Sequence, residues 1–144
     1  MLEKIDKARL RQVVEGYQFD LIVLFGSYAK GAARVNSDMD FAVRTTRPDF
    51  ARREVGREAA WKMDLLTDLS AVIEAPEGID MVLLNGADSL LLFEVARYGI
   101  PVYQQESTTF QQFQSYAARR FYDDAKFRRW EWEYLKRRFL VGKI

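Results

Sequence analysis

Apolar residues recur along this chain with two different periods, which separate its expected strands from its expected helices. Short apolar or alternating runs predict strands over residues 21–25, 38–43, 79–84 and 100–104. Apolar residues three or four positions apart predict helices over residues 3–16, 28–34, 50–69 and 88–98, followed by a helical C-terminal segment. The order αβαβαβαβα predicts an α/β fold, in which helices pack on a small mixed sheet.

Two of these elements have a predicted orientation. Side chains alternate between the two faces of a strand, so we expect strand 38–43 to place Asp38, Asp40 and Ala42 on one face and Met39, Phe41 and Val43 on the other. The long helix over residues 50–69 is expected to turn an apolar stripe inward, made of Val55, Ala59, Met63, Leu66 and Leu69. The two carboxylates of the strand therefore point the same way.

The composition excludes several classes of chemistry. The 144 residues include no Cys and no His, which excludes thiolate nucleophiles, zinc–thiolate sites and catalysis by imidazole. A metal would have to be held by carboxylates, which favour hard cations such as Mg²⁺ or Mn²⁺. The longest apolar run, Leu21 to Phe25, is too short to span a membrane, and the N-terminus lacks the apolar core of a signal peptide. We therefore expect a cytoplasmic protein.

A phosphate site is expected where strand 21–25 ends in Gly26 and Ser27. Backbone N–H groups at the start of a helix attract anions, glycine allows close approach, and the Ser27 hydroxyl adds a donor. In a helix over residues 28–34, Lys30 and Arg34 would share a face with Ser27 and could line the path of a triphosphate. The alternatives are that Ser27 only caps the helix and that Lys30 and Arg34 are ordinary surface charges.

The Asp38-x-Asp40 pair favours a metal site. Two carboxylates side by side on one strand face repel each other, and a divalent cation relieves that repulsion. Taken alone, the pair could be a solvated strand face. Together with the upstream Gly-Ser turn it supplies both halves of a nucleoside-triphosphate site, because magnesium binds through carboxylates and substrate phosphates.

At these positions the chain resembles the DNA polymerase β-type nucleotidyltransferase superfamily. The longer pattern G-S-x-A-[RK]-G followed by S-D-x-D is similar to the minimal nucleotidyltransferase (MNT) branch, the antitoxin partners of HEPN toxins. The matching residues are Gly26, Ser27, Ala29, Lys30, Gly31, Ser37, Asp38 and Asp40. The resemblance covers residues 20–104, and one departure is Lys30, where the branch often has Arg.

The resemblance also implies a third carboxylate at the start of a later strand. Asp80 in the segment over residues 78–85 is our candidate, either as a metal ligand or as the acceptor of a proton, since no His is present. Asp64 and Asp68 are rival third acids, and Lys62 is a weaker candidate base. The candidate catalytic and metal-binding residues are thus Asp38, Asp40 and Asp80, and the candidate nucleotide-binding residues are Gly26, Ser27, Lys30, Arg34 and Ser37.

The resemblance implies a magnesium-dependent transfer of AMP from ATP to a tyrosine hydroxyl of a cognate HEPN RNase toxin, which would silence the toxin. A small-molecule adenylyltransferase of the aminoglycoside type is one alternative, although such enzymes usually carry a second helical domain. A non-catalytic antitoxin that acts by binding alone is the other alternative. Three clustered carboxylates argue against that alternative, because they are costly to keep together without a metal.

The last 38 residues differ in charge and composition from the rest. Residues 1–106 hold 13 basic and 17 acidic side chains, whereas residues 107–144 hold 9 and 4, and half of the 20 aromatic residues. We therefore divide the chain into a nucleotidyltransferase domain, 1–106, and a C-terminal helical extension, 107–144. The extension could pack on the sheet, bind nucleic acid or dock a protein. We expect partial packing, with a protein-docking element from about Phe121 onward, and direct nucleic-acid binding is not favoured.

Overall fold

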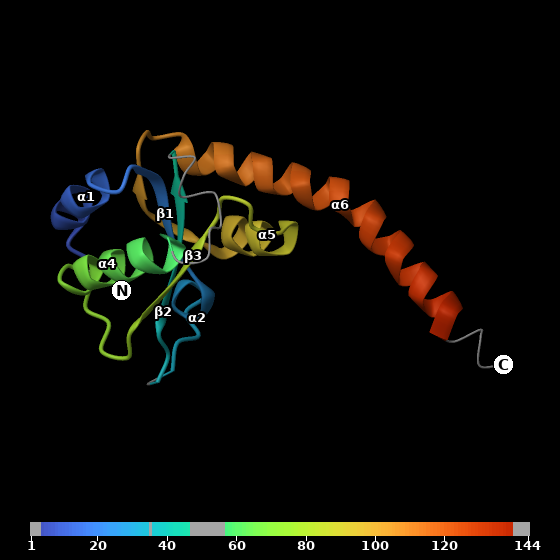
Figure 1. Cartoon of the computed structure of the whole chain (residues 1–144), viewed down its shortest axis with the longest axis horizontal. Coiled ribbons are helices and arrows are strands. Elements are labelled where there is room, and N and C mark those ends of the chain that lie inside the picture. The colour runs from blue at the N-terminus through green and yellow to red at the C-terminus, as the bar shows by residue number, and fades with distance from the viewer. Residues whose placement is uncertain (1–3, 35, 47–56, 140–144) are drawn as a thin grey trace.

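A four-stranded mixed sheet forms the centre of the protein (Figure 1). The computed structural model describes residues 4–34, 36–46 and 57–139. The strands are β1 (Phe19–Phe25), β2 (Met39–Thr45), β3 (Ile79–Leu83) and β4 (Ile100–Gln104), and their order across the sheet is β3-β2-β1-β4. Strand β1 runs antiparallel to β2 and β4, whereas β2 and β3 are parallel. The predicted α/β fold with a mixed sheet is confirmed.

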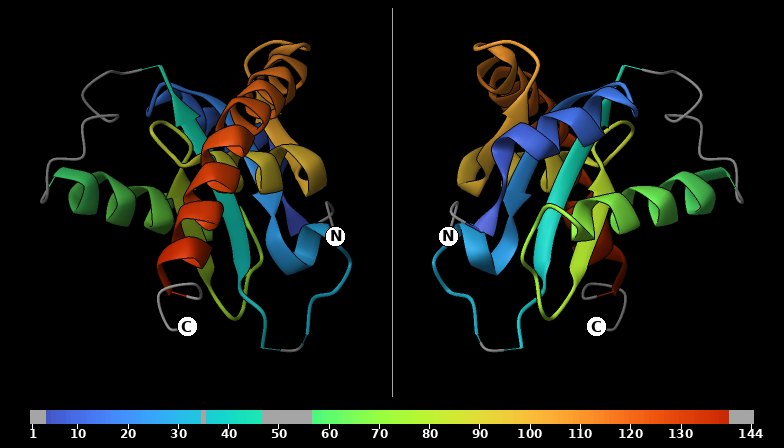
Figure 2. Two further views of the ribbon diagram at one scale, coloured as in Figure 1. Left: turned by 90° about the vertical axis from the view of Figure 1, so that its right-hand side faces the viewer. Right: turned by 90° about the vertical axis from the view of Figure 1, so that its left-hand side faces the viewer.

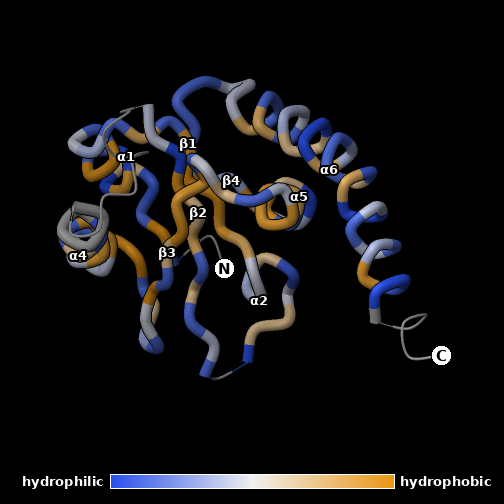
Figure 3. Tube along the Cα trace, turned by 45° about the vertical axis from the view of Figure 1, so that its right-hand side comes forward, coloured by the Kyte–Doolittle hydropathy of each residue, from blue (hydrophilic) through white to orange (hydrophobic). Residues whose placement is uncertain are grey.

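Helices cover both faces of this sheet. On one face lie α1 (Lys7–Glu15) and α4 (Arg57–Ser70), and on the other lie α5 (Ser89–Tyr98) and the start of α6 (Thr109–Phe139) (Figures 1 and 2). The short helix α2 (Gly26–Ala29) follows directly on β1. Hydrophobic residues concentrate along the strands and in the helices that cover them (Figure 3).

Alternation along the strands decides which residues face which helical layer. Ile22 and Leu24 of β1 belong to the cluster beneath α1 and α4, whereas Leu21 and Val23 belong to the cluster beneath α5 and α6. Because β1 is buried on both faces, it reads as a continuous apolar run. Strand β2 follows the predicted alternation, since Met39, Phe41 and Val43 join the first cluster and Ala42 joins the second.

The start of one helix and the range of another differ from the sequence prediction. The helix expected over residues 3–16 begins only at Lys7, because the Asp6 side chain accepts a hydrogen bond from the Arg9 N–H, 3.2 Å away, and so caps it. The helix expected over residues 28–34 covers Gly26–Ala29 instead, with Lys30 as its C-terminal cap. Gly31 follows with a φ of +70°, a conformation that ends a helix.

The inward stripe predicted for residues 50–69 is wrong at its centre. Met63 is 64% exposed, and over the described side chains of α4, residues 62–70, the buried ones are Leu65 and Leu69, one helical turn apart. Leu66 is partly buried against the same core. Val55 and the side chain of Ala59 lie outside the described residues.

The C-terminal segment is helical, as predicted, but its packed part extends further than expected. Phe113 and Ala117 of α6 are buried against the sheet and α5, and the Phe121 ring stacks on Phe93 of α5 with centroids 4.1 Å apart. Arg128 donates hydrogen bonds to the Ser89 hydroxyl, at 2.9 Å, and to the carbonyl of Phe121, at 3.0 Å. The docking element predicted from about Phe121 therefore begins in a part of α6 that still contacts α5, and docking itself stays a prediction.

Beyond Arg128, α6 runs away from the domain (Figure 1). Trp130 and Trp132 are 63% and 61% exposed there, and Tyr134 and Leu135 are also exposed. Among the described residues, no helix is both long enough and apolar enough to cross a membrane.

Candidate active site

Three carboxylates meet at one end of the sheet because of the strand register. Asp40 of β2 lies opposite Asp80 in the parallel pair with β3, and opposite Phe25 in the antiparallel pair with β1. Asp38 lies two residues before Asp40, where the period of a strand predicts the same face. Carboxylate oxygens of Asp38, Asp40 and Asp80 all lie within 4.8 Å of one another. We call these three residues the acidic triad.

Gly26 lies directly against the acidic triad. Its φ is +73°, a left-handed conformation that glycine adopts without strain. A Cβ at this position would lie 2.3 Å from Oδ2 of Asp40, closer than non-bonded atoms can approach. Glycine is therefore required here for two reasons, the backbone conformation and the space that the Asp40 carboxylate occupies.

The electrostatics of the triad favour a cation. Partial burial raises the pKa of Asp40 above its ordinary value, and the negative charges of Asp38 and Asp80 raise it further. Asp80 is oriented by its own strand, since its Oδ1 accepts a hydrogen bond of 2.9 Å from the Met81 N–H. Three oxygen donors of this kind fit a hard divalent cation such as Mg²⁺.

The Gly-Ser turn opens α2 next to the triad. The N-terminal cap of this helix is Phe25, and no side chain caps it. The alternative in which Ser27 serves only as a helix cap is therefore wrong. Ser27 lies in the first turn of α2, the helix that follows β1 directly.

Lys30 is held by helix α5. Its ammonium forms an ion pair of 2.5 Å with Glu94 and lies over the ring of Tyr98, 4.6 Å from the centroid. Glu94 and Tyr98 thus contact the candidate nucleotide-binding residue Lys30, and the sequence interpretation missed both of them. One signal could have found Glu94, because it is the only acid in an otherwise apolar helical run over residues 90–96.

Arg34 and Ser37 lie in the connection between α2 and β2. The Ser37 hydroxyl accepts a hydrogen bond of 2.8 Å from the Arg34 N–H, and the Ser37 N–H donates one of 3.0 Å to the Arg34 carbonyl. Because α2 ends at Ala29, the shared helix face predicted for Ser27, Lys30 and Arg34 does not form. Ser37 thus fixes the connection that leads into Asp38.

A family comparison agrees with this geometry. The model of the family described as "Polymerase beta, Nucleotidyltransferase" matches residues 8–108. The chain belongs to this family. No curated protein matches the chain.

Solved structures of toxin–antitoxin complexes share the fold of this nucleotidyltransferase. A toxin–antitoxin crystallised with AMP-PNP is 20% identical, with a TM-score of 0.53, and the match covers 96% of this chain and 98% of that chain. A complex of a tri-AMPylated Shewanella oneidensis HEPN toxin with its MNT antitoxin is 17% identical, with a TM-score of 0.54 and coverage of 99% and 98%. The toxin–antitoxin MntA-HepT is 17% identical, with a TM-score of 0.52 and coverage of 95% and 94%.

The alternative candidates for the third acid and for the base of this nucleotidyltransferase lie in a different layer of the fold. Lys62, Asp64 and Asp68 belong to α4, which packs through Leu65 and Leu69 on the sheet face opposite α5. Asp68 accepts a hydrogen bond of 2.6 Å from the Tyr17 hydroxyl. Burial, followed by this hydrogen bond, raises the pKa of the Tyr17 phenol well above its ordinary value. Asp68 therefore has a local partner on that face.

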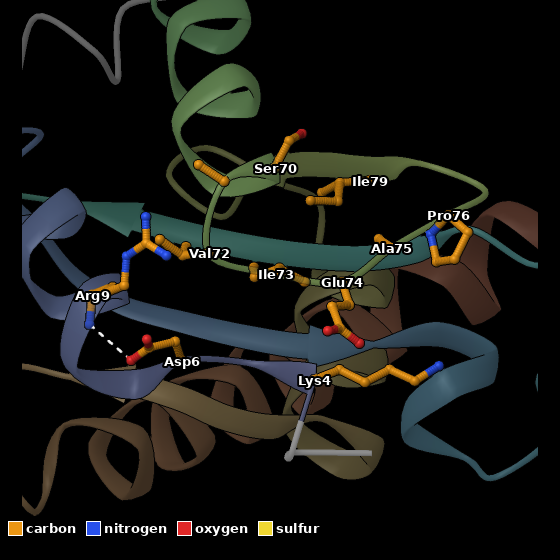
Figure 4. Close-up of a pocket in the computed structure, with 11 residues that line it drawn as sticks. Lys4, Asp6, Arg9, Ser70, Val72, Ile73, Glu74, Ala75, Pro76 and Ile79 are labelled. Carbon is orange, nitrogen blue, oxygen red and sulfur yellow. Dashed lines mark hydrogen bonds between the residues drawn. The ribbon is translucent and has the colours of Figure 1, made fainter.

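A hollow of about 780 Å³ lies between α1 and the segment that follows α4 (Figure 4). Its lining mixes charges of both signs, among them Lys4, Arg9 and Glu74. It lies on the α1–α4 side of the sheet, and no residue of the acidic triad lines it. The hollow and the acidic triad are separate features of the molecule.

Proposed function

We propose that this nucleotidyltransferase is an antitoxin that transfers AMP from ATP to a hydroxyl group, that of a tyrosine, on a cognate HEPN toxin. The observation that carries the proposal is the acidic triad, with its oxygens within 4.8 Å of one another and with Gly26 against Asp40. Metal-dependent phosphoryl-transfer sites hold their cations on carboxylates together with the substrate phosphates.

The solved complexes support the choice of donor and acceptor. One toxin–antitoxin of the same fold was crystallised with AMP-PNP, and another complex contains a tri-AMPylated HEPN toxin with its MNT antitoxin. The matches cover nearly the whole of both chains. This match over nearly the whole of both chains favours an antitoxin over a small-molecule adenylyltransferase.

The transfer has a simple balance of bonds. The hydroxyl oxygen of the acceptor forms a bond to the α-phosphorus of ATP, the bond from that phosphorus to the bridging oxygen breaks, and pyrophosphate leaves. The proton of the hydroxyl passes to a carboxylate, for which Asp80 is our candidate because the chain has no His. Gly26 and Ser27 would hold phosphate oxygens through backbone N–H groups and the Ser27 hydroxyl.

A divalent cation completes this arrangement. Asp38, Asp40 and Asp80 would hold Mg²⁺ or Mn²⁺, which offsets the negative charge of the phosphates and of the triad itself. The repulsion that raises the pKa of Asp40 supports this role, because a bound cation would remove it.

The partner would dock on the exposed end of α6. Trp130, Trp132 and Tyr134 are exposed there among Arg and Lys side chains, and Trp, Tyr and Arg are the residue types that dominate binding hot spots. This part of α6 leaves the domain after Arg128 and so is accessible without disturbing the sheet.

Labelled ATP tests the proposal directly. The purified protein is mixed with its co-expressed HEPN partner, Mg²⁺ and ATP labelled at the α-phosphate, and label should appear on the partner in wild type but not in Asp40→Asn. Label on neither protein, with the toxin still neutralised, would support the non-catalytic antitoxin. In a parallel reaction to which an aminoglycoside is added, label on the aminoglycoside instead of the partner would support the small-molecule enzyme.

A further inference from the structure

The phosphate-binding turn is tied to helix α5 through one side chain. Lys30 follows α2 directly, and its backbone N–H donates a hydrogen bond of 3.2 Å to the carbonyl of Gly26. Its ammonium pairs with Glu94 at 2.5 Å and lies 4.6 Å from the centroid of the Tyr98 ring. Backbone and side chain of Lys30 therefore connect Gly26 with α5.

Helix α5 is a firm anchor for this connection. Asp88 caps its start by accepting a hydrogen bond of 2.8 Å from the Leu91 N–H, and Leu92 and Val95 are buried against the sheet. Phe93, next to Glu94, stacks on Phe121 of α6. Because α5 is held on both sides, the carboxylate of Glu94 has a defined position relative to β1.

The exposure of the pair indicates positioning more than stability. Both side chains are 39% exposed, and ion pairs of this kind contribute little to the free energy of unfolding. The aromatic ring of Tyr98 restricts where the ammonium can lie, since a cation favours the face of a ring. The contact of Lys30 with Glu94 and Tyr98 can instead fix the position of the turn that carries Gly26 and Ser27.

We propose that Glu94 is a positioning residue, which holds the Gly26–Ser27 turn through Lys30 in the orientation that receives the triphosphate of ATP. This inference rests on the proposed function and assigns Lys30 a role other than direct phosphate contact. Glu94 itself touches no phosphate in this scheme. Its effect on nucleotide binding passes through the ammonium of Lys30.

Exchanging the two charges separates the two roles of Lys30. The variants are Lys30→Glu, Glu94→Lys and the double exchange, and calorimetry measures the Kd for ATP with Mg²⁺. Each single change should weaken binding about fivefold, the scale of an exposed ion pair, and the double exchange should return it to within about twofold of wild type. Glu74→Lys, a change of the same charge on the α1–α4 side, is the control and should leave Kd unaltered.

Direct contact between Lys30 and phosphate predicts the opposite pattern. The double exchange would then bind ATP as poorly as Lys30→Glu, and Glu94→Lys would bind it at least as well as wild type, because a cation is added near a polyanion. Either result overturns the inference.

A second measurement does not depend on nucleotide. Hydrogen exchange at the Lys30 amide of the free protein should be faster in both single variants and return toward the wild-type rate in the double exchange. If wild type binds no ATP, the proposed function fails, and the exchange rates still decide whether Glu94 holds the turn. Unchanged rates in the single variants would refute the positioning role.

Discussion

The carboxylate of Asp40 occupies the space that a side chain at Gly26 would need, because a Cβ on Gly26 would lie 2.3 Å from Oδ2 of Asp40. Gly26 follows β1 directly, and Asp40 of β2 is the register partner of Phe25, the last residue of β1. The Gly26–Ser27 turn and the acidic triad are thus packed against each other. A side chain at position 26 would therefore displace the Asp40 carboxylate.

Gly26→Ala should therefore damage the site beyond its effect on stability. The left-handed backbone alone costs an alanine about 1 kcal/mol of folding free energy, and the clash with Asp40 adds displacement of that carboxylate. We expect Mg²⁺-dependent ATP binding to weaken by about tenfold or more, as measured by calorimetry. Gly86→Ala is the matched control, because Gly86 has a φ of +74° but open space around its Cβ position. Equal losses of binding in both variants would refute the packing argument.

Asp40→Asn should stabilise the metal-free protein while abolishing its activity. The substitution removes a charge that Asp38 and Asp80 repel, so in EDTA we expect the melting temperature to rise by roughly 1–3 °C. AMP transfer in Mg²⁺ should fall by about 100-fold or more.

ATP affinity of wild type should also depend on Mg²⁺ or Mn²⁺. Equal affinity in EDTA and in magnesium would contradict the metal role of the triad.

Cation binding should be lost at a higher pH than an ordinary aspartate would allow. The pKa of Asp40 is raised in the folded protein, and the carboxylate must be ionised to bind a cation. Mg²⁺ affinity should thus fall as the pH falls through this raised pKa. Stability without metal follows the opposite direction: it decreases as the pH rises from about 4 through the raised pKa, because the folded state binds the proton more tightly. Calorimetry and thermal melts at stepped pH values check both trends, and Asp40→Asn should flatten the second.

Asp80→Asn should impair transfer far more than Asp64→Asn or Asp68→Asn. Only Asp80 lies opposite Asp40 in the strand register, whereas the other two acids lie on α4. We expect about 100-fold loss in the labelled-ATP assay for Asp80→Asn and near wild-type transfer for the other two. An active Asp80→Asn together with an inactive Asp64→Asn would mean that the third carboxylate is misassigned.

The exposed end of α6 should be needed for partner capture and not for ATP binding. Trp130→Ala combined with Trp132→Ala should weaken capture of the co-expressed partner by about 2 kcal/mol or more, the scale of a hot spot, with the Kd for ATP unaltered. Tyr122→Ala, an exposed aromatic on the part of α6 before Arg128, is the control. If RNA binding with a steep salt dependence is lost in the double variant instead, the nucleic-acid alternative gains support.

The local sequence pattern determined the positions of the strands and the face that carries the two aspartates. The period of two in strand 38–43 predicts which face carries Asp38 and Asp40, and the apolar runs with their Gly and Pro boundaries predict four strands, because these signals depend on neighbours in the sequence. The Gly-Ser turn and the Asp-x-Asp pair also predicted the family that the comparison shows. Each of these signals is contained in a stretch of about 20 consecutive residues or fewer.

Only the tertiary structure decided which distant residues meet. The parallel register of β2 and β3 brings Asp80 opposite Asp40 across 40 positions, and packing of α5 against α2 brings Glu94 to Lys30 across 64. Packing also selected Leu65 over Met63 as the buried side of α4, and it extended the attached part of α6 to Arg128. Such contacts depend on how whole elements dock, and helical or strand periodicity carries no information about the partner that an element finds.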